Sequence, residues 1–177
     1  IAVSEAQRGW LEDRGVPAAK LHTIHPWSGR EDLLAVPDLP ARPNRPLRLL
    51  AYGRLAPEKN FAALIEAMDR LAPGLAELTV FGSGPEETQL AALASERANV
   101  HLLPATNDIA PQLRDCDAVL VPSRFEAFGL VATEARLAGR PILVADVDGL
   151  PEQVRGGGIV APMQDADEIA RAIQLLS

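Results

Sequence analysis

From Leu47 to the end of the chain, short apolar runs alternate with amphipathic stretches, and this alternation constrains the fold more than any other feature. The runs expected to form strands are residues 47–52, 76–81, 99–103, 117–121 and 141–145. The stretches expected to form helices are residues 61–71, with Asn60 as the N-cap, and residues 86–95, 107–114, 129–138 and 165–176. Apolar strands that alternate with helices predict a parallel sheet covered on both faces, which is an α/β, Rossmann-like domain of three layers.

The first 46 residues lack this alternation. Residues 4–14 are expected to form a helix and residues 21–24 a short strand. The stretch that follows contains five prolines, Pro26, Pro37, Pro40, Pro43 and Pro46. Proline disfavours regular structure, so this stretch predicts a linker or a wrapping segment. We therefore divide the chain into residues 1–46 and a domain at residues 47–177. Because the chain begins at Ile1, inside an apolar run, we expect it to be one part of a longer protein.

Composition excludes several classes of protein. The chain has 177 residues, of which 47% are hydrophobic and 23% charged, as in one globular domain. The net charge of −7 argues against a nucleic-acid partner, which would need a basic face. The single cysteine, Cys116, excludes an internal disulfide and indicates a reducing compartment, so we expect a cytoplasmic protein. No apolar run has the ~20 residues of a membrane helix, so no transmembrane segment is expected.

The residues just after each predicted strand are the first candidates for a binding site, because parallel sheets bind ligands beyond the carboxyl ends of their strands. Gly53 and Arg54 follow the first strand, and four residues separate Arg54 from Lys59. Gly53 would let the backbone turn close to a ligand. A guanidinium and an ammonium at one strand end suit a diphosphate. The alternative is a solvated pair of side chains in an ordinary loop.

Two glycines, Gly82 and Gly84, follow the second strand. They would allow backbone N–H groups to line an anion, although a tight strand-to-helix turn uses the same residues. The third glycine of a dinucleotide-binding motif is replaced by Glu87, and the Gly-Lys-Ser/Thr of a phosphate-binding P-loop is absent.

The most informative stretch follows the fourth predicted strand and contains Glu126 and Glu134. A helix that begins near Gly129 would aim its free N–H groups and its positive dipole end at a phosphate. Carboxylates accept hydrogen bonds from sugar hydroxyls, so we expect Glu126 near a hexose and Glu134 near a ribose. The alternative is one exposed glutamate and one glutamate in a first helical turn, where acidic residues are common.

These residues resemble a known family. Glu126 and Glu134 are separated by seven residues, as in the Glu-x7-Glu motif of family 4 retaining glycosyltransferases, and residues 122–135 resemble that family's signature. Arg54 and Lys59 are similar to its phosphate motif, and residues 82–85 resemble its glycine turn. Residues 138–141 and 149–152 resemble the stretches after its second glutamate. The resemblance implies the donor-binding, C-terminal half of a GT-B glycosyltransferase.

The resemblance also implies roles for residues. Arg54 and Lys59 would bind the diphosphate of a nucleotide-sugar donor, Glu126 would contact the transferred sugar, and Glu134 the ribose. The further expected donor contacts are Gly53, Gly82, Gly84, Phe128, Gly129 and Leu130, with Leu103 near the nucleobase. Leaving-group charge would be stabilised by Arg54, Lys59 and the helix near Gly129.

For the activity, the resemblance implies retaining hexosyl transfer without a metal or cofactor. The acceptor, a saccharide or a lipid-linked molecule, would bind a missing N-terminal domain. We therefore expect the 177 residues to bind the donor with negligible turnover. The longer protein would be cytoplasmic or peripheral at the cytoplasmic face of a membrane. Residues 25–29 depart from the family's Asn-Gly-Val-Asp-like turn, and Asp148-Gly149 from its paired glycine, which leaves the subfamily open.

Metal-binding patterns are present but are expected to be coincidental. Three Asp-x-Asp pairs occur, at residues 115–117, 146–148 and 165–167, in a chain rich in aspartate. The last is expected to start a helix, where aspartate is a good cap. The three histidines are scattered without ligand spacing, so no metal site is predicted.

Three other functions compete. A non-catalytic nucleotide-binding domain of the same ancestry would have lost functional residue types, whereas here the phosphate and glutamate positions keep theirs. A sugar epimerase of the GT-B fold would use the same ligands and stays open. An NAD-binding oxidoreductase predicts a glycine-rich turn after the first strand, where Gly53-Arg54 stand instead.

Overall fold

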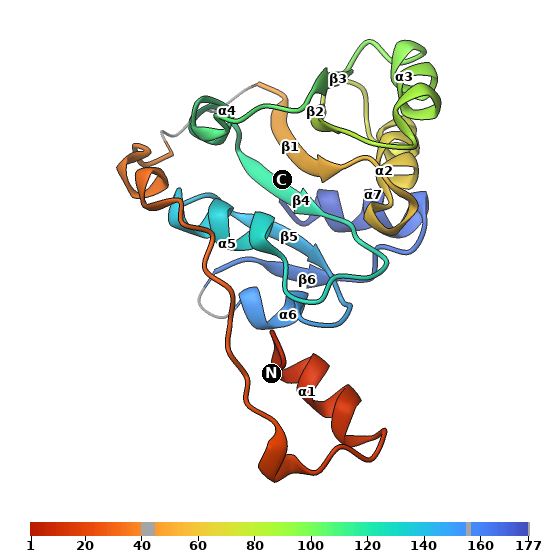
Figure 1. Cartoon of the computed structure of the whole chain (residues 1–177). Coiled ribbons are helices and arrows are strands. Elements are labelled where there is room, and N and C mark those ends of the chain that lie inside the picture. Colours follow the sequence, from red (N-terminus) through yellow and green to blue (C-terminus); the bar gives the residue numbers. More distant parts are fainter. Residues whose placement is uncertain (40–44, 155–156, 177) are drawn as a thin grey trace.

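The computed structural model describes residues 1–39, 45–154 and 157–176, and its centre is one parallel sheet of six strands (Figure 1). The strands are β1 (Leu47–Arg54), β2 (Ala76–Ser83), β3 (Val100–Pro104), β4 (Ala118–Val121), β5 (Ile142–Ala145) and β6 (Ile159–Ala161). They lie in the order β3-β2-β1-β4-β5-β6. This order is that of a Rossmann-type sheet, so the predicted α/β fold is confirmed.

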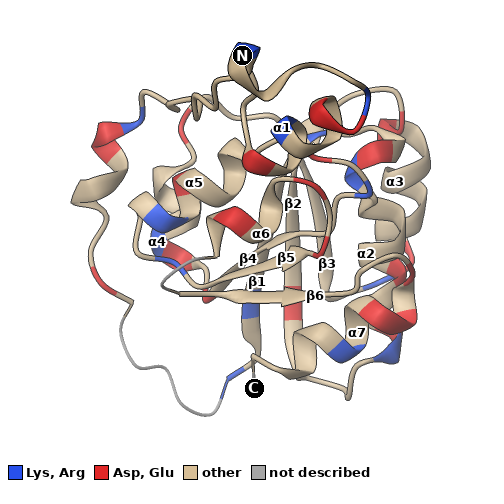
Figure 2. Cartoon of the chain, turned by 90° about the horizontal axis from the view of Figure 1, so that it is seen from below, with Lys and Arg blue, Asp and Glu red and all other residues tan. Residues whose placement is uncertain are grey.

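Helices cover both faces of the sheet. The α-helices are α1 (Glu5–Glu12), α2 (Phe61–Ala67), α3 (Glu87–Ser95), α4 (Ala110–Asp115), α5 (Leu130–Leu137), α6 (Leu150–Gln153) and α7 (Ala166–Gln174). Short 3-10 helices span Ala18–Lys20, Glu31–Ala35, Pro57–Lys59 and Met68–Arg70. Helices α2, α3 and α7 pack together on one face, and α4, α5 and α6 lie on the other (Figures 1 and 2). Every residue of β4 and β5 is buried as a result, which explains their wholly apolar sequences.

Several expectations were wrong in detail. Between residues 146 and 164 the chain forms α6 and the edge strand β6, which are too short to give a periodic pattern. The predicted strand at residues 21–24 is only a single bridge between Ala2 and Thr23. Asn60 precedes α2 in the left-handed conformation, with φ 58°, and does not cap it. Its side chain instead donates to the carbonyl of Met163 at 2.9 Å.

The N-terminal segment, residues 1–39, meets the sheet domain through a few discrete contacts. Helix α1 has no buried residue and lies beside α6, away from the sheet (Figure 1). The carboxylate of Glu152 accepts hydrogen bonds from the backbone N–H groups of Glu5, at 3.0 Å, and Ala6, at 2.9 Å. Leu33 is fully buried in the core, and Arg140 donates to the carbonyl of Pro37. The segment therefore wraps onto the domain. The predicted contributions of Pro40 and Pro43 lie outside the described residues, and the division at residue 46 stays a prediction.

Charges of both signs are interspersed on the ribbon, without one basic face in this view (Figure 2). None of the helices in the described part of the chain has the length and apolar character that crossing a bilayer requires.

Candidate functional site

The centre of the sheet contains the place where a Rossmann-type fold binds ligands. Strands β1 and β4 are neighbours, and the chain leaves this point toward β2 on one side and β5 on the other. Such a switch point opens a crevice at the carboxyl ends of the strands. A cavity of about 510 Å³ lies there. It is lined by Arg30, Tyr52, Gly53, Arg54, Phe81, Gly82, Ser83, Ala105, Thr106, Ile109, Val131 and Glu134.

Backbone forms part of the cavity wall where β1 and β2 end. Gly53 and Gly82 are partners in the register of the two strands. A Cβ atom at Gly82 would lie 2.2 Å from the carbonyl oxygen of Gly53, so the two ends meet only because Gly82 lacks a side chain. Gly84 acts differently, because a Cβ there would lie 2.4 Å from the carbonyl oxygen of Leu55. Gly84 permits the β2–α3 turn and does not line the cavity.

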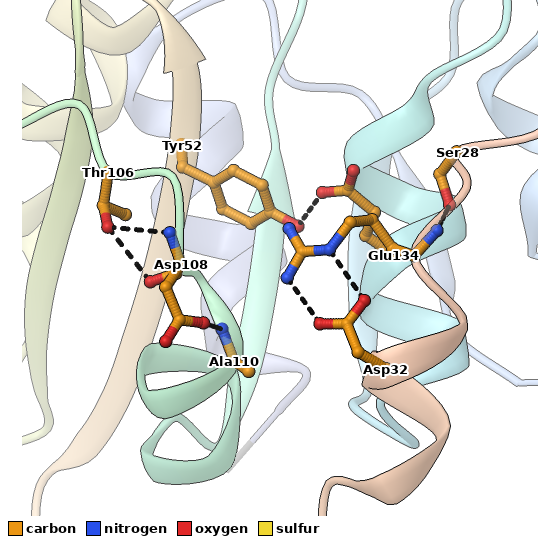
Figure 3. A network of polar contacts seen from close by, with 8 residues as sticks. Ser28, Asp32, Tyr52, Thr106, Asp108, Ala110 and Glu134 are labelled. Carbon is orange, nitrogen blue, oxygen red and sulfur yellow. Dashed lines mark hydrogen bonds and ion pairs between the residues drawn. The ribbon is translucent and has the colours of Figure 1, made fainter.

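Tyr52 and Glu134 meet across the cavity from β1 and α5 (Figure 3). The Tyr52 hydroxyl donates to Oε2 of Glu134 at 2.9 Å. Burial, and next the charge of Glu134, raise the pKa of Tyr52, so the hydroxyl stays protonated and remains a donor. Glu134 is thereby held in place by a residue that the sequence interpretation missed, although Tyr52 directly precedes the predicted Gly53-Arg54 motif.

Lys59 and Glu126 form an ion pair between the loops that follow β1 and β4. Both side chains are mostly buried, with 23% of Lys59 and 17% of Glu126 exposed. The loop of Glu126 is fixed by Asp148, whose carboxylate accepts a hydrogen bond from the Glu126 backbone N–H at 2.9 Å. These two predicted residues therefore lie together, next to the switch point and outside the set that lines the cavity.

Arg54 lines the cavity but makes little contact with protein. Its side chain is 68% exposed and lies 3.9 Å from the carboxylate of Glu58. An exposed guanidinium with one weak partner can bind an incoming anion at small cost, because little existing interaction must be broken.

The start of α5 is shaped by Gly129, which precedes the helix with φ 93°. A Cβ at Gly129 would lie 2.5 Å from Cδ2 of Leu150, so a side chain there would push α5 and α6 apart. Phe128 is buried with its ring 5.0 Å from that of His25, and Leu130 is 41% exposed. The N–H groups of Leu130 and Val131 have no partner within the helix, as at any helix start, whereas those of Ala132 and Thr133 donate to the carbonyl of Gly129 at 3.1 Å and 3.2 Å.

Leu103 is one of the predicted residues that do not line the cavity; the others are Lys59, Gly84, Glu126, Phe128, Gly129 and Leu130. Leu103 lines a separate hollow of about 300 Å³, together with Gln112 and Cys116, where burial raises the pKa of the Cys116 thiol to about 12. The loop after β3 enters the cavity at the switch point through Ala105 and Thr106 instead.

Arg30 lines the cavity although the sequence analysis assigned its stretch to a linker. Its guanidinium forms a bidentate pair with Asp32, in which Nε donates to Oδ1 at 2.9 Å and Nη2 donates to Oδ2 at 2.8 Å. The hydrogen bond with Asp32 is the largest of the effects that raise the pKa of Arg30, and the charges of Glu134 and Asp108 also raise it. No motif surrounds Arg30, so nothing in the sequence pointed to its place in the cavity.

At least one aspartate of each Asp-x-Asp pair has a structural partner, as shown above for Asp148. Asp117 accepts from the backbone N–H of Arg48 at 2.7 Å, and Asp165 caps α7 by accepting from the N–H of Glu168 at 2.9 Å. Among the described residues there is no group of three or more His, Cys, Asp or Glu side chains placed to hold a metal ion.

Sequence comparison gives a consistent set of relatives. A family model described as glycosyl transferases group 1 matches residues 46–177. Glycogen synthase from Mycobacterium tuberculosis is 34% identical over 143 residues, which cover 73% of this chain and 33% of that protein. D-inositol 3-phosphate glycosyltransferase from Streptomyces bingchenggensis is 33% identical, over 91% of this chain and 39% of that protein. The chain thus spans well under half the length of these relatives.

Solved structures share the fold. Alr3699/HepE from Anabaena, in complex with UDP, has a TM-score of 0.82 at 23% identity, over 98% of this chain and 52% of that one. Sucrose-phosphate synthase from Thermosynechococcus elongatus has a TM-score of 0.78 at 25% identity, over 99% of this chain and 48% of that one.

Proposed function

This chain belongs to the glycosyl transferases group 1 family, and from that premise we propose that its sheet domain binds the nucleotide-diphospho-sugar donor of a retaining hexosyltransferase. The observation that carries the proposal is the cavity at the β1/β4 switch point, which has a cation, Arg54, and a carboxylate, Glu134, on its wall. The cation can bind a diphosphate, and the carboxylate can accept hydrogen bonds from the diol of a ribose. The UDP in the complex of the Anabaena relative is in accord with such a ligand.

The diphosphate would bind between Arg54, Lys59 and the start of α5. Arg54 is exposed and nearly unpaired, so it can engage phosphate oxygens directly. Lys59 is paired with Glu126 in the free chain. A diphosphate would compete with that carboxylate for the ammonium group. These cations and the N–H groups of α5 would also stabilise the charge that develops on the leaving diphosphate, without a metal.

The sugar would lie on the other side of Lys59, where Glu126 can accept hydrogen bonds from its hydroxyl groups. Release of Glu126 from Lys59 by the diphosphate would free the carboxylate for this contact. The hydrogen bond from Tyr52 keeps Glu134 oriented toward the ribose. Donor binding would thus exchange one ion pair for two sets of ligand contacts.

The reaction of the longer protein is part of the same proposal. We infer an acceptor saccharide or lipid-linked acceptor that binds a second domain, in a cytoplasmic protein or one peripheral to the cytoplasmic membrane face. The match covers only 33% of the glycogen synthase and 52% of the Anabaena protein, so we expect the 177 residues to bind the donor but not to transfer its sugar.

Calorimetry of the chain with UDP, GDP, ADP and their sugars, with and without magnesium, tests the proposal. We expect one nucleotide diphosphate to bind without magnesium and to lose at least tenfold in affinity in Arg54→Ala and in Lys59→Ala, as expected for a lost charged hydrogen bond. Arg114→Ala is the matched control, since this exposed arginine lies on α4 outside the cavity. Absence of binding by every nucleotide, or binding only with magnesium, would contradict the proposal.

Glu126→Gln separates the sugar contact from the phosphate contact. The substitution removes the carboxylate that competes for Lys59, so the nucleotide diphosphate should bind as tightly or more tightly. The nucleotide sugar should lose its added affinity relative to the diphosphate. A parallel loss for both ligands would mean that Glu126 supports the phosphate site only.

A further inference from the structure

Arg30 occupies a position in the donor cavity that neither the sequence motifs nor the family-matched region explains. The family model begins at residue 46, whereas Arg30 comes from the N-terminal segment, just before the 3-10 helix Glu31–Ala35. That segment is fixed to the domain by Leu33, which is fully buried. The backbone N–H of Arg30 also donates to Oγ of Ser28 at 3.3 Å. Arg30 is therefore held at the cavity wall by its own local structure.

The guanidinium of Arg30 is oriented before any ligand arrives. Asp32 engages one edge of it through Nε and Nη2. In the described part of the chain, Nη1 donates to no protein atom, so its hydrogens are available in the cavity. A planar guanidinium locked by a bidentate carboxylate loses little freedom when it donates further hydrogen bonds.

Opposite charges thus face one cavity in an arrangement that combines donors and acceptors. Oε2 of Glu134 accepts a hydrogen bond from the hydroxyl of Tyr52. Its Oε1 accepts no hydrogen bond from the described residues. Asp32, Tyr52 and Glu134 converge on one place, with Thr106 and Asp108 beyond Tyr52 (Figure 3). The other cation on the wall, Arg54, lies at the end of β1, where the diphosphate is proposed to bind.

We propose that Arg30 and Glu134 together read the vicinal diol of the donor's ribose, with Glu134 accepting the hydroxyl hydrogens and Arg30 donating to the hydroxyl oxygens. The assignment rests on the proposed donor site. A hydroxyl is both a donor and an acceptor, so a carboxylate alone satisfies only half of its capacity. A donor-only guanidinium next to that carboxylate satisfies the other half. Arg30 is therefore a specificity-determining residue for a ribonucleotide over its deoxy analogues.

The test compares ligands that differ in one group. UDP, 2′-deoxy-UDP, 3′-deoxy-UDP and inorganic pyrophosphate are titrated into the wild type and into Arg30→Met, which keeps an unbranched apolar stem but removes the guanidinium and its donors. The same series with GDP or ADP is used if the wild type prefers one of those bases. Arg30→Met should bind the ribonucleotide about tenfold more weakly. Its preference for ribose over at least one deoxyribose should shrink by a similar factor, with pyrophosphate unchanged.

Matched variants separate this role from others. Arg114→Met, on α4, should match the wild type with all ligands, and Arg54→Ala should lose pyrophosphate binding. Asp32→Asn keeps Arg30 but weakens the bidentate pair that orients its guanidinium. The loss of ribonucleotide affinity should therefore be smaller than in Arg30→Met. The thermal midpoint of each variant shows whether the fold is intact.

Other binding results would overturn the assignment of Arg30 to the ribose diol. An equal loss for ribo- and deoxynucleotides in Arg30→Met, or a loss for pyrophosphate, would overturn the diol assignment. Unchanged binding in Arg30→Met would overturn it as well, while leaving the proposed function standing. A wild type that binds no nucleotide at all would overturn both.

Discussion

The sheet domain and the N-terminal segment are held in place by different means. In the sheet domain every residue of β4 and β5 is buried, and the helices on both faces share one apolar core. In the N-terminal segment α1 buries nothing, and the contacts are separate from one another; they include a carboxylate on the helix start, the buried Leu33 and a hydrogen bond from Arg140 to Pro37. A domain held by continuous burial unfolds as a unit, whereas a segment held by discrete contacts can open locally. The difference predicts which variants change global stability and which do not.

The largest effect is expected in the sheet. Leu143 on β5 is fully buried, so Leu143→Ala should reduce the free energy of unfolding by about 2–5 kcal/mol through lost burial and a residual cavity. Leu175→Ala is the control, since this leucine is 63% exposed. Denaturant titration measures the free energy of unfolding of both variants. The rate of Cys116 alkylation reports unfolding independently, because burial raises the pKa of that thiol and keeps it protonated in the folded chain. Equal stability of the two variants would contradict continuous burial.

Leu33 tests the attachment of the N-terminal segment. Leu33→Ala should lower the free energy of unfolding by about 2 kcal/mol. This is at the low end for a buried leucine, because the segment can relax around the cavity. It should also weaken nucleotide binding, since Leu33 anchors the stretch that carries Arg30. Its neighbour Leu34 is 65% exposed, so Leu34→Ala should change neither property. If Leu33→Ala lowers the free energy of unfolding of the sheet domain as much as Leu143→Ala does, the two regions are one cooperative unit.

Two helix caps offer a direct comparison. Asp165 caps α7 in the domain, and Ser4 caps α1 by accepting from the N–H of Gln7 at 3.1 Å. Asp165→Ala should lower global stability by about 1 kcal/mol. Ser4→Ala should leave the denaturation midpoint nearly unchanged but speed amide exchange in α1. Similar shifts of the midpoint in both variants would show that α1 unfolds with the sheet.

The smallest effect is expected at Glu152. Glu152→Gln removes the charge that faces the start of α1 and should weaken its docking by about 0.3–1 kcal/mol. Hydrogen exchange should rise at the amides of Glu5 and Ala6, with nucleotide affinity unchanged. Glu12→Gln, at the other end of α1, serves as the control. An unchanged exchange rate at both amides would mean that other contacts hold the helix.

The sequence predicted the part of the molecule that is built by repetition. Strands of four or more residues and the helices between them repeat a clear pattern, so the parallel sheet and the ligand-binding edge at the carboxyl ends of its strands followed from it. Strand β6 has only three residues and α6 only four, which is too short for a period to emerge. Asn60 was misassigned because its side chain binds Met163, which is 103 positions away and invisible to a local rule.

The site divides in the same way. Gly53, Arg54, Gly82 and Glu134 line one cavity, and Lys59 pairs with Glu126, as residues that follow parallel strands would be expected to do. Leu103 lies in another hollow because its side chain leaves β3 away from the site, so that the loop beyond it enters the cavity. Arg30 was missed because nothing in a proline-rich stretch indicates which of its side chains the fold will bring back to the sheet.

The cavity also bears on the order of events in folding. Tyr52 and Glu134 are 82 positions apart, and Lys59 and Glu126 are 67 apart. Contacts of such long range carry a large loop-closure cost and depend on β4 having docked beside β1. A ligand held by both pairs can engage only a chain whose sheet is already assembled. Such a ligand slows unfolding and leaves the folding rate nearly unchanged. Its binding during refolding therefore marks the time at which β4 has docked beside β1.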